Sequence, residues 1–289
     1  MTTSIDNPLV ICAAITGGGP AKKRTPFHPV SHDALVEEAI ACGRAGAAIV
    51  HLHARDKSGQ PTMSVSAYRD LVHDIRAAGS DVVINFSAGD NGGRSNHAER
   101  RAVIGAGAEM VSFGAGSFNI HDRLYDNSPN YVNSMLEALR QQRVLPEIEI
   151  FDTGQLQNVK RLLEEGAIPT PASLQFVFGI SGGMPASKSL LNELLKELPA
   201  KCHWSICCQT PDHSVWREMM LYAFLRGGDI RTGMEDVVQT TPGVLASSNA
   251  ELVHQWVETA NIWGRPLVKP ADLRRQLGLP ALRHLENVS

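Results

Sequence analysis

Apolar runs of strand length alternate with segments of helical periodicity eight times along this chain of 289 residues. Eight strand-then-helix units in a chain of this length predict a closed (β/α)8 barrel, or TIM barrel, and an open doubly wound sheet is the alternative. The apolar runs lie at Leu9–Ile15, Ala47–His51, Asp81–Phe86, Met110–Phe113, Glu147–Phe151, Leu174–Phe178, Cys202–Cys207 and Asp229–Arg231. The helical patterns lie near Asp33–Ala45, Ser66–Ala78, His97–Ala106, Pro129–Gln142, Gln155–Glu165, Ser187–Leu195, Ser214–Arg226 and Ser248–Trp263.

The segments between and after these units predict the domain organisation. No G-x-G-x-x-G sequence occurs at the first strand–helix turn, which weighs against a dinucleotide-binding sheet. No stretch rich in Pro, Gly or Ser divides the chain, so residues 1–289 are predicted to form one domain. Leu267–Leu279, with prolines around it, is predicted to form one short helix in a C-terminal extension over about residues 265–289.

Composition excludes several classes of partner. A formal net charge of −3 leaves no basic excess for binding nucleic acid or an anionic membrane. No apolar stretch approaches the roughly 20 residues of a membrane span, and Met1–Asp6 lacks the basic and apolar regions of a signal peptide. The five cysteines are odd in number and have no C-x-x-C spacing, as expected for reduced thiols. We therefore expect a cytoplasmic protein whose partners are small molecules.

His51 and His53 stand at the end of the second predicted strand. Side chains at positions i and i+2 of a strand point to the same face, so the two imidazoles are expected to project side by side. Imidazole is the commonest metal ligand at neutral pH, and two such groups with a third ligand can hold a catalytic zinc ion. The alternative is a pair of partly buried histidines with ordinary hydrogen-bond partners.

Barrel closure predicts the third ligand. Active sites of such barrels collect at the carboxyl ends of the strands, where the last predicted strand runs into Arg231–Asp236. Strand eight of a closed barrel neighbours strand one, which neighbours strand two, so Glu235 can approach His51 and His53. Two histidines and one glutamate form a ligand set known for catalytic zinc. A solvated loop is the alternative interpretation of this charged turn.

Six motifs occur in order along the predicted strand ends. They are Ala13-Ala14-Ile15-Thr16-Gly17, His51-Leu52-His53-Ala54-Arg55, Asn85-Phe86-Ser87-Ala88-Gly89, Pro146-Glu147-Ile148-Glu149-Ile150-Phe151-Asp152, Phe178-Gly179-Ile180-Ser181-Gly182-Gly183-Met184 and Arg231-Thr232-Gly233-Met234-Glu235-Asp236. Together they span nearly the whole chain and resemble the β-keto acid cleavage enzymes, a family of zinc-dependent (β/α)8 barrels.

The resemblance implies a reaction in which a β-keto acid and acetyl-CoA exchange an acyl unit. The products are acetoacetate and a new acyl-CoA, formed through a metal-stabilised enolate. The resemblance makes His51, His53 and Glu235 the ligands of Zn²⁺, and another divalent metal is the alternative. A homo-oligomer, specifically a tetramer, is the assembly that the resemblance implies.

The resemblance also assigns roles around the metal. Arg231 and Asp236 match the arginine and aspartate that assist enolate formation, and Ser87 matches a serine near the substrate carboxylate. These roles are chemically reasonable, because a carboxylate can take the α-proton, directly or through water, and a guanidinium offers a planar fork to a carboxylate or thioester oxygen. Gly182 and Gly183 are predicted to present backbone N–H groups to an anion, with a plain turn as the alternative.

Two departures from the family pattern bear on the substrate and on CoA. Gly19 stands where the family's enzyme for an amino-bearing substrate has a glutamate that pairs with the substrate ammonium. We therefore expect Gly19 to favour neutral or differently charged β-keto acids, with Asp90 as the alternative partner for an ammonium. Ser205-Ile206-Cys207-Cys208-Gln209 replaces a more Gly-rich stretch and could reshape the acyl-CoA side of the mouth.

Other interpretations of the same residues remain open. Glu147 and Glu149 share one face of the fifth predicted strand and are expected either near the metal or in an ion pair with an arginine. A zinc-dependent hydrolase or an aldolase-type lyase on the same barrel is the alternative function. A barrel that has lost activity and acts as a binding protein is a further one.

Overall fold

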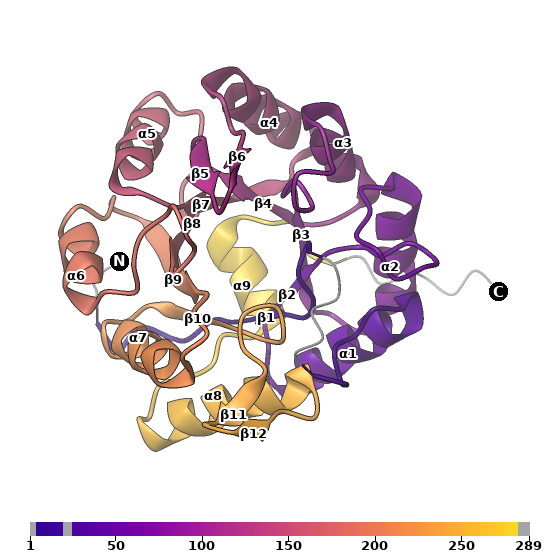
Figure 1. Ribbon diagram of the computed structural model, residues 1–289, viewed down its shortest axis with the longest axis vertical. Helices are drawn as coiled ribbons and strands as arrows, with labels where there is room; N and C mark the ends of the chain where they lie inside the picture. Colours follow the sequence, from indigo (N-terminus) through magenta and orange to yellow (C-terminus); the bar gives the residue numbers. More distant parts are fainter. Residues whose placement is uncertain (1–3, 20–24, 283–289) are drawn as a thin grey trace.

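The computed structural model describes residues 4–19 and 25–282, in which eight parallel strands close into a barrel with helices around the outside (Figure 1). In order around the barrel the strands are β1 (Ile11–Ala14), β2 (Ile49–Leu52), β3 (Val83–Ser87), β4 (Met110–Gly114), β7 (Leu145–Ile150), β8 (Ala172–Phe178), β9 (Cys202–Cys208) and β10 (Asp229–Thr232). Pairing of β10 with β1 closes the ring. The predicted (β/α)8 barrel is confirmed.

Most of the surrounding helices begin where a Ser, Asp or Asn side chain accepts a hydrogen bond from a backbone N–H of the first turn. The predicted helix over His97–Ala106 is divided, because only its first part is α-helical and Val103–Ala106 forms a 3-10 turn. The helices are α1 (His32–Ala45), α2 (Val65–Ala77), α3 (His97–Ala102), α4 (Pro129–Gln142), α5 (Thr153–Glu164), α6 (Lys188–Lys196), α7 (His213–Leu225), α8 (Asn249–Ile262) and α9 (Pro270–Leu277).

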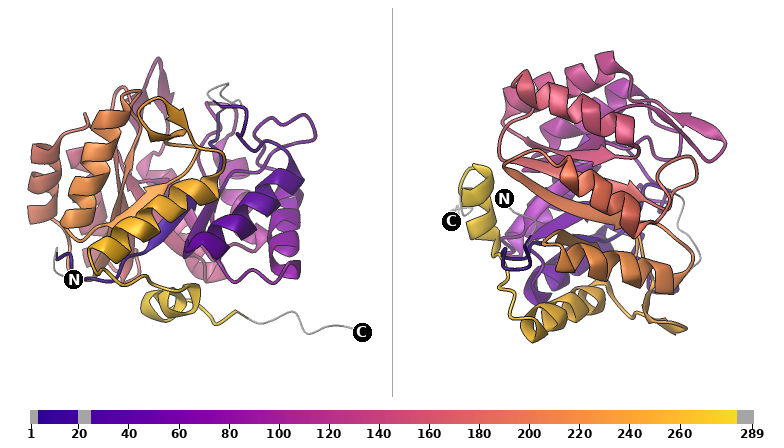
Figure 2. Two further views of the ribbon diagram at one scale, coloured as in Figure 1. Left: turned by 90° about the horizontal axis from the view of Figure 1, so that it is seen from below. Right: turned by 90° about the vertical axis from the view of Figure 1, so that its left-hand side faces the viewer.

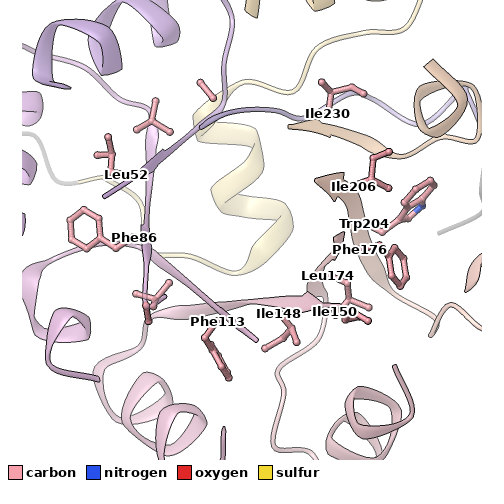
Figure 3. Packing of buried hydrophobic residues seen from close by; sticks show 14 of the residues in the cluster. Leu52, Phe86, Phe113, Ile148, Ile150, Leu174, Phe176, Trp204, Ile206 and Ile230 are labelled. Carbon is pink, nitrogen blue, oxygen red and sulfur yellow. The ribbon is translucent and has the colours of Figure 1, made fainter. Parts of the chain in front are cut away.

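The main apolar core lies between the barrel and its helices. Residues at alternate positions of the strands, among them Leu52, Phe86 and Phe176, are fully buried and point away from the barrel axis (Figure 3). The intervening positions point inward, and toward the carboxyl ends of the strands they become polar, as His51, Asn85 and Glu147 do. This alternation places the chemistry inside one end of the barrel.

Helix α9 closes the opposite end of the barrel, at the amino ends of the strands (Figure 2). Its Leu273 and Leu277 pack in one apolar cluster with inward-facing strand residues such as Val83 and Met110. Arg274, which is 3% exposed, donates from Nε to Glu109 Oε1 at 2.5 Å. The short C-terminal helix was predicted, and residues 283–289 of the predicted extension lie outside the described residues.

Two hairpins interrupt the regular alternation, and the sequence analysis predicts neither. Strands β5 (Phe118–Ile120) and β6 (Arg123–Tyr125) pair within the connection from β4 to α4. Strands β11 (Gln239–Thr241) and β12 (Val244–Leu245) pair between β10 and α8. These strands of two or three residues are too short to produce a recognisable period.

No helix within the described residues is long and apolar enough to cross a membrane. All five cysteines are buried and free.

Candidate active site

His51 and His53 lie at the carboxyl end of β2 and face the barrel interior. Their ring centroids are 5.2 Å apart, and the residues are 1% and 5% exposed. The outward-facing Leu52 between them packs in the apolar core, which fixes the direction of both imidazoles. The strand therefore presents two nitrogen donors to the same space, as its i, i+2 spacing predicts.

Glu235 reaches the histidines because the turn after β10 lies directly against β1. Gly233 has a φ of 133°, and a Cβ atom there would lie 2.2 Å from the carbonyl oxygen of Ala14. Only glycine fits this close approach. The Glu235 N–H then donates to the same Ala14 oxygen at 3.2 Å, and Asn249 Oδ1 accepts from the Met234 N–H at 2.7 Å.

The geometry of His51, His53 and Glu235 fits one shared cation. Glu235 Oε2 lies 3.7 Å from His51 Nε2, and Glu235 Oε1 lies 3.5 Å from His53 Nε2. Both separations exceed an ordinary hydrogen bond, but two ligand atoms on one tetrahedral zinc ion are about 3.3 Å apart. Within residues 4–19 and 25–282, this is the one group of at least three His, Cys, Asp or Glu side chains close enough to hold a metal.

Two glycines after β1 leave room for this group. A Cβ atom on Gly17 would lie 3.2 Å from Glu235 Cγ, and one on Gly18 would lie 2.9 Å from the His53 ring. Arg55, two residues after His53, donates to the Gly17 carbonyl oxygen at 2.5 Å. The glycine-rich loop is thus held against the histidines without filling their space.

Arg231 bridges two carboxylates at the end of β10. Its Nη2 lies 2.9 Å from Glu235 Oε1, and its Nε donates to Asp236 Oδ2 at 2.8 Å. Asp236 Oδ1 also accepts from Cys207 Sγ at 3.5 Å and from Gln209 Nε2 at 3.4 Å. The Asp236 side chain is fully buried. Four donor atoms on three side chains hold it in one orientation: Arg231 Nε and Nη2, Cys207 Sγ and Gln209 Nε2.

The electrostatics favour the ligand forms of these groups. Burial, followed by the charge of Arg231, lowers the pKa of His51 well below its ordinary value and keeps the imidazole neutral. Burial alone would raise the pKa of Glu235, but Arg231, His53 and His51 together hold that pKa well below its usual range. A neutral imidazole and an ionised carboxylate are the forms that bind a metal.

His53, Glu235, Arg231 and Ser87 line one cleft of about 160 Å³ at the carboxyl end of the barrel. Asp236 is sealed behind the cleft-lining side chains of Arg231, Cys207 and Gln209. The cleft thus brings two of the predicted metal ligands, His53 and Glu235, to one surface with Ser87, and His51 is grouped with these two ligands.

Glu149 also lines the cleft, whereas Glu147 lies deeper in the barrel. Glu147 accepts from Asn85 Nδ2 at 2.7 Å, and Glu149 accepts from Ser112 Oγ at 3.0 Å. Among the described residues neither carboxylate forms an ion pair with an arginine, and each accepts a hydrogen bond from an uncharged side chain instead. Burial raises the pKa of Glu149 to about 7, with Arg231 opposing the shift and Glu147 adding to it.

The predicted glycine contacts lie at the margins of the site. Gly19 follows Gly18, and a Cβ atom on it would lie within 4 Å of no atom of residues 4–19 and 25–282, its chain neighbours aside. Gly182 and Gly183 lie in the loop after β8, where the Gly183 N–H donates to the Ile180 carbonyl oxygen at 3.0 Å. That N–H is satisfied within its own turn, and the predicted anion contact of these glycines stays a prediction.

Sequence reasoning assigned no role to several cleft residues that come from loops. Arg123 on β6 contacts Asp90 in the loop after β3, with Nη2 donating to Oδ1 at 3.0 Å and Nη1 donating to Oδ2. Tyr125 and Phe151 form part of the apolar wall. Arg123 and Tyr125 lie in a segment with no recognisable period, whereas Phe151 ends the predicted strand Glu147–Phe151.

The fold and this site define a barrel enzyme whose candidate metal ligands stand at the carboxyl ends of β2 and β10. A profile of the beta-keto acid cleavage enzyme family matches residues 8–279. The chain belongs to that family, which confirms the resemblance inferred from the six motifs.

Two relatives cover almost the whole chain. The 3-keto-5-aminohexanoate cleavage enzyme of Acetoanaerobium sticklandii is 32% identical over 94% of this chain and 98% of its own length. The 3-oxoadipate:acetyl-CoA acetyltransferase of Cupriavidus necator is 31% identical over 95% of this chain and 96% of its own length.

A similar solved structure is the apo form of ObcA, with a TM-score of 0.73 and 20% sequence identity. The match covers 88% of this chain and 66% of that longer chain. At this identity the likeness supports the barrel fold alone.

Proposed function

We propose that the protein is a metal-dependent β-keto acid cleavage enzyme that uses acetyl-CoA as its second substrate. The exchange gives acetoacetate and the acyl-CoA of the remaining tail. The observation that carries the proposal is the convergence of two imidazoles and a glutamate, of which His53 and Glu235 line one cleft, in a chain of this family. Relatives named for an acetyl-CoA-dependent acetyltransferase and for keto-acid cleavage support it.

In this proposal His51, His53 and Glu235 hold a divalent cation, with zinc the first choice because the donor set is two imidazoles and one carboxylate. When bound, such a cation supplies Lewis-acid polarisation of the keto oxygen and stabilises enolate charge. Ser87 contacts the substrate carboxylate region, and the backbone at Gly182 and Gly183 is the proposed anion contact. We place the enzyme in the cytoplasm as a homo-oligomer, a tetramer by resemblance.

The proposed reaction proceeds through a carbanion formed on the substrate itself. The substrate α-carbon loses a proton, and the resulting carbanion attacks the acetyl carbonyl of acetyl-CoA with departure of the CoA thiolate. That thiolate adds to the original keto carbon, and the bond from this carbon to the former α-carbon breaks, which releases acyl-CoA and the enolate of acetoacetate. The enolate then takes back the proton that the substrate α-carbon lost, which gives acetoacetate. No serine or cysteine nucleophile is needed.

Two carboxylates are candidates for the proton acceptor. Asp236 is the residue that resemblance assigns, and it contacts Arg231, but its side chain is fully buried. Glu149 lines the cleft itself, and a pKa of about 7 suits proton transfer near neutral pH. We propose that Asp236 orients Arg231 and assists enolate formation, with transfer through water, while Glu149 is the alternative acceptor.

The test is turnover of a panel of β-keto acids with acetyl-CoA, measured as acyl-CoA and acetoacetate by mass spectrometry. The protein is assayed as purified, after chelation, and after chelation followed by Zn²⁺, Mn²⁺, Co²⁺ or Ni²⁺. We expect turnover that needs acetyl-CoA, is lost on chelation and returns with metal. Hydrolysis or cleavage that proceeds without acetyl-CoA would indicate the hydrolase or lyase alternative instead.

A further inference from the structure

The cleft that His53 and Glu235 line also contains the ion pair between Arg123 and Asp90. Both guanidinium Nη atoms contact the carboxylate, and the side chains are 29% and 11% exposed. The pair joins the β5–β6 hairpin to the loop after β3 across the mouth of the barrel. A two-point contact of this kind has a defined geometry and satisfies both charges.

Asp90 is held in place by its own loop. Its Oδ1 accepts from the Gly92 N–H at 3.1 Å, and its carbonyl oxygen accepts from the N–H groups of Arg94 and Ser95 at 2.9 and 3.0 Å. The carboxylate thus stays at the cleft whether or not Arg123 occupies it. Removal of Arg123 would leave a fixed, largely buried negative charge facing the substrate.

Apolar side chains form one wall of the cleft that contains the pair. Ile120, Val177 and Ile180 line the same cleft, and Phe118 stacks on the cleft residue Phe151 with ring centroids 4.3 Å apart. In such surroundings a charge that loses its partner is poorly compensated. A charged substrate group therefore has two choices. It displaces Arg123 or Asp90 from the ion pair and takes its place, or it remains without a partner of opposite charge.

We propose that the Arg123–Asp90 pair selects β-keto acids whose acyl tail is uncharged, an inference that rests on the proposed function. An ammonium tail at this end of the cleft meets Asp90 already bound by Arg123. A carboxylate tail meets Arg123 already bound by Asp90. An uncharged tail leaves the pair intact and packs on the apolar wall, so the pair rejects both signs of charge.

The test compares three six-carbon β-keto acids with acetyl-CoA: 3-oxohexanoate, 3-keto-5-aminohexanoate and 3-oxoadipate. We expect the wild-type protein to have its highest kcat/KM with 3-oxohexanoate. Arg123→Gln should raise the ratio of the ammonium acid to the uncharged acid by on the order of 10- to 100-fold, because Asp90 is released. Asp90→Asn, which keeps an oxygen for the Gly92 N–H, should raise the ratio for 3-oxoadipate similarly.

Two controls separate charge from packing. Arg94→Gln, an exposed residue of the same loop, should leave all three ratios unchanged. The double variant Arg123→Gln with Asp90→Asn removes both charges and should keep the preference for the uncharged acid. This double variant also keeps the inference testable if one single variant folds poorly.

The outcomes are distinguishable. A wild-type preference for either charged acid, or unchanged ratios in both folded single variants, overturns the role of the pair and leaves the proposed function intact. Failure of the metal-loaded wild-type protein to turn over any of the three acids with acetyl-CoA overturns the proposed function, and the inference with it.

Discussion

Arg231 and Asp236 form a buried ion pair at the end of β10, with Arg231 Nε donating to Asp236 Oδ2 at 2.8 Å and both side chains at most 2% exposed. The same guanidinium also contacts Glu235. One arginine therefore compensates a candidate metal ligand and a candidate catalytic carboxylate together. Loss of either contact is expected to change the other, which makes this region sensitive to single substitutions.

Replacement of the arginine is expected to destabilise the fold. Arg231→Met leaves the fully buried Asp236 without a cationic partner, and breaking a buried pair this way typically costs about 3–5 kcal/mol of unfolding free energy. Urea denaturation of the chelated protein measures it. Arg140→Met, whose side chain is 71% exposed, is the matched control and should change the value by less than about 1 kcal/mol. Equal effects of both substitutions would contradict the buried-pair argument.

Removal of a candidate ligand is expected to remove the metal. His53→Ala should reduce the metal content of the purified protein to that of chelated wild type and abolish turnover, while the circular dichroism spectrum stays native. Metal content is measured by plasma mass spectrometry. His254→Ala, an exposed histidine on α8, is the control and should retain metal. Full occupancy and activity in the His53 variant would refute the ligand assignment.

The buried aspartate is expected to matter for rate and not for metal binding. Asp236→Asn preserves the shape of the side chain but removes its charge, and loss of acid–base assistance typically costs roughly 10²–10⁴-fold in kcat. Steady-state kinetics at saturating acetyl-CoA, together with metal analysis, measure both properties. A near-normal kcat would leave Glu149 as the proton acceptor and Asp236 as a residue that only positions Arg231.

The pH dependence of stability is expected to report on Glu149. Burial raises its folded-state pKa from 4.5 to about 7, so the folded protein holds a proton that the unfolded chain releases. Its contribution to stability is thus present below about pH 4.5 and lost as pH rises through about 7. Glu149→Gln lacks this loss, so its stability relative to wild type should increase between pH 5 and 8.

Denaturation at several pH values measures that difference. Glu164→Gln, on an exposed helix face, is the control and should show no comparable trend. If the stability of the Glu149 variant relative to wild type fell as the pH rises, the raised pKa of Glu149 would be contradicted.

Specificity for an ammonium tail is expected to be restorable at Gly19. A Cβ atom there meets none of the other described residues within 4 Å and the backbone is not left-handed, so Gly19→Glu should fold normally. The new carboxylate stands where the resemblance places an ammonium partner. We expect kcat/KM for 3-keto-5-aminohexanoate to rise about 10-fold, with Gly19→Gln as the uncharged control. Equal gains in both variants would show that charge is not the cause.

The sequence predicts the barrel well because its strands are buried on both faces and appear as continuous apolar runs. His51, His53 and Glu235 could be brought together by two geometric rules, strand alternation and ring closure. The β5–β6 hairpin could not be predicted, because three-residue strands carry no period. The Arg123–Asp90 contact joins loops 33 residues apart, and nothing local in either segment indicates the other. The full burial of Asp236 likewise depends on tertiary packing against β9.

The position of α9 bears on how the protein is made. Residues 266–268 pair with Leu9 just before β1, and the helix then covers the amino ends of the strands. Synthesis proceeds from the amino end, so all eight strands leave the ribosome before the segment that covers their apolar floor. Until Leu279 has emerged, Val83, Met110 and their neighbours have no partner on that side. The nascent barrel thus passes through a stage in which the apolar surface at the amino ends of its strands is exposed. A chaperone would find the largest apolar surface to bind at this stage.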